Sequence, residues 1–166
     1  MTNNIFESRD KESVTKLLGM TEVELSAAIT SLCEDLREWG YPDQDRLVLA
    51  GRNARRRVDI LTAIVLREAK LTEDPFVEAC LLWFLIGLWE GKTRYTPAEA
   101  GFLLSYRISG TDYGRVEALF YLVYGYYKSL ERSQVSETIH VLKDLHAASK
   151  LGRSHTLRID ELAREL

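Results

Sequence analysis

The stretch TEDPFVEACLLWFLIGLWEGK, residues 72–92, decides the fold of this chain. Pro75 near its start stands at an early helical position. The apolar run Ala79–Trp89 lies between Glu78 and Glu90. The run is 11 residues long, whereas a helix that spans a membrane needs about 20. We therefore expect a helix buried at the centre of the protein, and no membrane partner.

The residues before this run predict further helices. Thr21 and Glu24 form a capping box, the arrangement that satisfies free amides at a helix start, and the apolar residues that follow recur every three or four positions. The longest predicted helix covers Gln44 to Lys70. Gly51 and Ala54 on its apolar stripe are small, so a neighbouring helix could approach closely there.

The residues after the run complete an all-α pattern. Thr96 and Glu99 form a second capping box at the start of a short helix, and three further helices are expected beyond it. The sequence thus predicts a compact single-domain bundle of about seven or eight helices over residues 1–166. We expect residues 1–9 to be flexible and residues 153–166 to form a loosely packed terminal helix.

Composition and cysteine usage fit a protein of the cytoplasm. The formal net charge of −3 does not suggest a protein that coats itself in nucleic acid, although a local basic patch stays open. Cys33 and Cys80 each lie in an apolar helical pattern without CxxC spacing. We interpret them as two buried thiols, because that pattern fits neither a disulfide framework nor a zinc site. Residues 1–10 are polar and carry no apolar signal core.

The most prominent charged feature is a run of arginines on the predicted long helix. The candidate residues for binding nucleic acid, because Arg forks bind phosphate well, are Arg52, Arg55, Arg56 and Arg67. A helical wheel places Arg52, Arg56 and Arg67 together, opposite the apolar stripe. The alternative is pairing with the acidic face of the preceding helix, which carries Glu22, Glu34, Asp35 and Glu38. We favour pairing, because no aromatic residue stands nearby at stacking spacing.

A surplus of aromatic residues hints at an interface. The chain has eight Tyr, five Phe and three Trp, and most of them sit at core spacing. Tyr106, Tyr121 and Tyr126 lie off the main stripes of their helices. Tyrosines outside a core, with arginine nearby, are residue types that anchor protein interfaces. These three are therefore the candidate partner-binding residues.

The sequence carries no complete motif for catalysis or cofactor binding. Residues 96–116 begin like a helix-turn-helix unit, but the connection is too long and the second helix too aromatic, so an ordinary helical hairpin is expected. Glu137 and His140 form one Glu-x-x-His pair, whereas a di-iron bundle uses two. We therefore expect neither a metal site nor a cofactor.

These observations favour a non-enzymatic protein-interaction module: an adaptor, an inhibitor or immunity-type protein, or a small subunit of a complex. Its partner would be another protein or a second copy of the chain. A nucleic-acid-binding protein that uses the arginine face is the alternative. An enzyme whose site assembles from residues distant in sequence, such as Glu78, Glu90, Glu117 or His140, also stays open.

Overall fold

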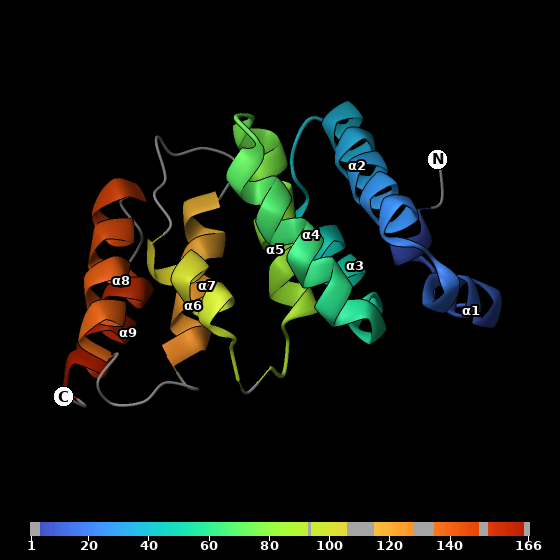
Figure 1. Ribbon diagram of the computed structural model, residues 1–166. Coiled ribbons are helices and arrows are strands. Elements are labelled where there is room, and N and C mark those ends of the chain that lie inside the picture. The colour runs from blue at the N-terminus through green and yellow to red at the C-terminus, as the bar shows by residue number, and fades with distance from the viewer. Residues whose placement is uncertain (1–3, 93, 106–114, 128–134, 150–152, 165–166) are drawn as a thin grey trace. The chain divides into compact units, whose positions relative to one another are not determined.

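The computed structural model describes residues 4–92, 94–105, 115–127, 135–149 and 153–164. Over these residues it contains nine α-helices, two short 3-10 turns and no strand (Figure 1). This confirms the all-α prediction, with slightly more helices than expected. None of the described helices is both long and apolar enough to cross a membrane. The chain divides into two compact units, residues 1–91 and 92–166, and the single domain stays a prediction.

The first unit is built around α5 (Pro75–Leu88), the helix predicted from the apolar run. Most of its residues are buried, and α2, α3 and α4 contact it. The other elements of this unit are η1 (Ile5–Glu7), α1 (Lys11–Gly19), α2 (Glu22–Trp39), α3 (Gln44–Asn53), η2 (Arg55–Arg57) and α4 (Val58–Leu71). At the start of α2, Thr21 and Glu24 make the predicted capping box.

Helices α3 and α5 approach each other closely because a glycine on each helix faces the partner. A Cβ atom on Gly51 would overlap the backbone of Phe84, and one on Gly87 would overlap the backbone of Val48. Only glycine leaves room for this approach of two backbones. The close approach predicted at Gly51 is thus present, and Gly87 supplies the matching gap on α5.

The predicted long helix over Gln44 to Lys70 is wrong, because the chain bends between α3 and α4. The bend lies in η2, where Arg57 has left the helical region with φ −115° and ψ 33°. The Arg57 guanidinium donates hydrogen bonds to the carbonyls of Leu17, Leu18 and Met20 at 2.9, 3.1 and 2.9 Å. Leu17 and Leu18 lie in the last turn of α1, where carbonyls lack the usual helical partner, and Met20 caps the helix. The Leu17 carbonyl also accepts from the Met20 amide at 3.4 Å. Arg57 therefore holds the bend against the end of α1.

The second unit contains α6 (Pro97–Ser105), α7 (Arg115–Tyr127), α8 (Val135–Ser149) and α9 (Arg153–Arg164). Its α6 starts with the predicted reciprocal bonds between Thr96 and Glu99, at 3.2 and 3.3 Å. Helix α9 buries a stripe of His155, Ile159 and Leu162, and its loose packing stays a prediction. Spacings of four and three residues place this stripe on one face.

Candidate functional site

The four arginines proposed to bind nucleic acid do not share one face. Arg52 forms an ion pair with Glu90, which follows the end of α5. Arg67 on α4 pairs with Glu22 of α2 at 3.1 Å and with Glu68 at 3.4 Å. The Glu22 contact is the pairing with the acidic helix that the sequence favoured. Because the bend at η2 separates α3 from α4, the helical wheel that grouped these arginines no longer applies.

Two exposed arginines of the run have no polar partner among the described residues. Arg55 and Arg56 begin η2, and no salt bridge or hydrogen bond joins either side chain to a described residue. The Arg57 guanidinium donates its hydrogen bonds to carbonyls at the end of α1. The basic surface left by the run therefore consists of two neighbouring guanidinium groups rather than a groove lined by four.

The three candidate tyrosines have different surroundings. Tyr126 of α7 is only 3% exposed, and its ring meets Tyr95 edge-on with centroids 4.9 Å apart. Burial raises the pKa of Tyr126 and raises that of Tyr95 to about 12. Tyr126 is thus a core residue, which corrects the expectation that it lies outside the core. Other residues of the second unit bury Tyr126. The apolar stripe of a single helix does not predict such contacts. Tyr106 lies outside the described residues.

Tyr121 remains partly accessible on α7. The Arg158 guanidinium of α9 lies 5.6 Å from the centre of the Tyr121 ring and 5.4 Å from that of Tyr124. His155 tilts against the same Tyr121 ring with centroids 5.8 Å apart. This aromatic and cationic cluster ties α9 to α7, so the contacts of Tyr121 within its own unit already account for its position.

The sequence analysis missed two exposed aromatic rings at the end of α2. Trp39 is 59% exposed and Tyr41 is 55% exposed. Gly40 lies between them with φ 91°, a left-handed conformation that ends the helix directly after Trp39. Spacing alone placed Trp39 on the apolar stripe of α2, but the stripe ends at the fully buried Leu36. Two aromatic residues around a helix-ending glycine were the signal in the sequence.

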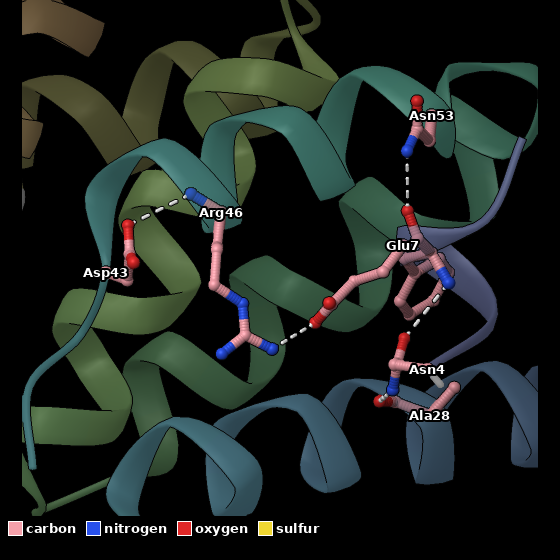
Figure 2. A network of polar contacts seen from close by, with 7 residues as sticks. Asn4, Glu7, Ala28, Asp43, Arg46 and Asn53 are labelled. Carbon is pink, nitrogen blue, oxygen red and sulfur yellow. Dashed lines mark hydrogen bonds and ion pairs between the residues drawn. The ribbon is translucent and has the colours of Figure 1, made fainter. Parts of the chain in front are cut away.

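Arg46 of α3 completes this surface, which we call the aromatic patch: Trp39, Tyr41 and Arg46. The Arg46 guanidinium carbon lies 5.9 Å from the centre of the Trp39 ring. Its Nη2 atom donates to Glu7 Oε1 at 2.7 Å, as Figure 2 shows. A cation over an indole face contributes about 0.5–1 kcal/mol at an exposed site. Glu7 therefore holds Arg46 in place beside the aromatic ring.

Several hydrogen bonds join the segment that carries Glu7 to the rest of the first unit, whereas the flexibility of residues 1–9 stays a prediction. Asn4 donates to the carbonyl of Ala28 at 2.7 Å and accepts from the Phe6 amide at 3.0 Å. Asn53 donates to the Phe6 carbonyl at 2.8 Å (Figure 2). The Phe6 side chain is completely buried. Residues 4–9 thus pack against α2 and α3, because one buried ring and several hydrogen bonds outweigh the entropy of a free end.

Three of the residues named for a possible enzyme have partners within their own units. Glu90 pairs with Arg52, and His140 lies 3.5 Å from Asp144, with both side chains largely exposed. Glu117 Oε1 lies 3.9 Å from His155 Nε2. Among the described residues, no group of three or more His, Cys, Asp and Glu could hold a metal ion.

Comparison of the chain with protein-family models, curated proteins and solved structures finds no match. The case for a function therefore depends on the geometry of the surfaces described above. Of these, the aromatic patch combines the greatest exposure of large rings with a fixed charged group.

Proposed function

We propose that this protein is a non-enzymatic protein-interaction module and that the aromatic patch is its contact surface. The exposure of Trp39 and Tyr41 beside a fixed arginine carries this proposal. Trp, Tyr and Arg are the residue types that supply most of the binding free energy at protein interfaces. The partner would be another protein, and an adaptor, an inhibitor or a small subunit would each present such a surface.

The fixed position of Arg46 also supports binding. An immobile side chain loses little conformational entropy when a partner arrives, whereas each flexible one costs about 0.5–1.5 kcal/mol. The ion pair with Glu7 has already reduced that entropy in the free protein. Trp39 and Tyr41 have only two rotatable side-chain angles each, so these large rings lose little conformational entropy when they bind a partner.

Nucleic-acid binding through the arginine run is the less favoured function. Arg52 and Arg67 are engaged in ion pairs, which a phosphate would have to displace. Arg55 and Arg56 stay available, but two contacts make a weak, salt-sensitive site. We keep the cytoplasm as the proposed compartment, because two lone cysteines in apolar helical patterns do not form the disulfide framework of a secreted domain.

The proposal can be tested by photo-crosslinking. A benzoylphenylalanine at position 41 should capture one specific protein from an extract of the native host. The same group at position 71 is the matched control, because Leu71 is also a highly exposed large residue. The captured protein is then purified and its affinity measured by titration against the unmodified chain.

Variants decide whether the patch itself makes the contact. Trp39→Ala should weaken binding about 10-fold or more, as expected for a truncated interface anchor. Val23→Ala removes another exposed apolar side chain of α2 and should leave the affinity unchanged. Equal capture from positions 41 and 71, or full affinity in Trp39→Ala, would reject the aromatic patch. Capture of a second copy of this chain would identify the partner as self-association.

A further inference from the structure

Two cysteines lie on two contacting helices of the first unit. Cys33 belongs to α2 and Cys80 to α5, and both are free and buried. The adjacent Cys33 thiol, together with burial, raises the pKa of Cys80 above its ordinary value. Cys80 therefore keeps its proton and is a poor nucleophile by itself. The sequence indicated two buried thiols but gave no sign that they meet.

Only one of the two thiols borders open space. A pocket of about 240 Å³ lies between α2, α4 and α5, and Cys33 lines it together with Ile29, Val77 and Leu81. Cys33 is 6% exposed, whereas Cys80 is completely buried and is not part of the pocket wall. A small reagent in this pocket would therefore meet Cys33 before it meets Cys80.

We propose that Cys33 and Cys80 form a reversible disulfide when a small uncharged peroxide enters this pocket. The Cys33 thiolate attacks one peroxide oxygen, the O–O bond breaks, and the departing hydroxide takes up a proton to become water. Cys33 is then a sulfenic acid. The Cys80 sulfur attacks the Cys33 sulfur and forms the S–S bond, while the S–O bond breaks and the hydroxyl leaves with the Cys80 proton as a second water. The two thiols lose two electrons and the peroxide gains them.

The rim of the pocket favours a peroxide over a large anionic oxidant. Glu34 and Glu68 contribute two carboxylates to the rim. Arg37 is the one cation among the described lining residues, and it is paired with Asp74. Oxidised glutathione is both bulky and negatively charged, so this rim should repel it. Hydrogen peroxide is uncharged and smaller than the pocket.

The test uses the full chain, first reduced and then treated with hydrogen peroxide in native buffer. Remaining thiols are blocked with N-ethylmaleimide under denaturing conditions, and the intact mass is measured. We expect a loss of about 2 Da without any maleimide adduct, and a Cys33–Cys80 linked peptide after digestion. Oxidised glutathione at the same concentration should react at least about 10-fold more slowly, since charge and size exclude it.

Single variants assign the order of the two steps. Cys80→Ser should accumulate a Cys33 sulfenic acid that dimedone traps, and Cys33→Ser should leave Cys80 unmodified by peroxide. If Cys80→Ser fails to fold by circular dichroism, Cys80→Ala replaces it, because alanine leaves no polar atom in the buried position.

The oxidation experiment tests the Cys33–Cys80 disulfide, and its result does not depend on whether the aromatic patch binds a partner. Retention of both thiols in native buffer, a disulfide that forms only in urea, or a disulfide between two chains would each overturn it. Trp39→Ala should oxidise at the wild-type rate, because Trp39 does not line the pocket. Loss of partner binding in that variant would thus leave this test intact.

Discussion

Replacement of Gly87 by alanine should destabilise the first unit by forcing α3 and α5 apart. The added Cβ atom would overlap the carbonyl of Val48 and approach the amide nitrogen of Arg52. Both are backbone atoms of α3, so no side-chain rotation can relieve the overlap. The only relief is a shift of one helix, which loosens the packing of buried neighbours such as Leu47 and Leu88.

Two opposing free energies set the size of the effect. Overpacking a dense contact costs about 1–3 kcal/mol, and a clash between backbones belongs in the upper half of that range. Alanine in a helix interior recovers about 0.5–1 kcal/mol relative to glycine. The net loss is therefore about 1–2.5 kcal/mol. For a unit of residues 1–91 this lowers Tm by about 4–20 °C.

Urea denaturation followed by tryptophan fluorescence measures this loss, because all three tryptophans of the chain lie in the first unit. Gly19→Ala is the matched control: Gly19 ends α1, and a Cβ there meets nothing within 4 Å. It should leave stability unchanged or raise it slightly. A Gly87→Ala protein as stable as the Gly19→Ala protein would refute the close approach of the two helices.

Three further changes test other contacts. Arg57→Met removes the donor to three carbonyls and should cost about 2–3 kcal/mol of unfolding free energy in urea, whereas Arg56→Met should cost almost nothing. Thr21→Ala removes a helix cap and should cost about 1 kcal/mol. Hydrogen bonds from Thr21 lower the pKa of Glu24 below its ordinary value of 4.5. The ionised Glu24 therefore stabilises the folded protein above pH 4.5, and this contribution is lost as the pH falls through the lowered pKa. The variant should show a shallower loss of stability in acid. In salt titrations, duplex DNA binding through the arginine run should have a slope no steeper than about −1.8, since only Arg55 and Arg56 of that run have no ion pair or hydrogen bond to a described residue.

The sequence predicted helices well where the determining contacts are local. The capping boxes at Thr21 and Thr96 lie within four residues, and both are present. The run in α5 is apolar on every side, which fixes its central position without knowledge of its neighbours. Gly51 signalled a close helix approach because a small residue stands at an apolar position.

Predictions failed where a distant residue decides the local conformation. Apolar spacing of three and four residues continues from Leu47 through Ala54 to Val58, so nothing in the pattern indicates the bend in η2. The bend is held by Arg57 bonding to carbonyls near residue 17, some 40 positions earlier. Likewise, the N-terminal segment looks polar, yet its single Phe6 finds a buried position. Tertiary contacts of this kind override the local signal.

The arginine run shows why charge density along a chain does not define a binding surface. Arg52, Arg55, Arg56 and Arg57 lie within six residues, and a straight helix would display several of them together. In the structure these four arginines have different partners. Arg52 forms an ion pair, Arg57 bonds to the end of α1, and Arg55 and Arg56 have no polar partner among the described residues. A phosphate backbone needs several guanidinium groups at once, because each contact contributes little at physiological salt. A protein partner needs one or two large rings in a fixed frame, and the end of α2 provides these. The break at η2 therefore weakens the case for nucleic-acid binding through the arginine run, and the aromatic patch stays the proposed contact surface.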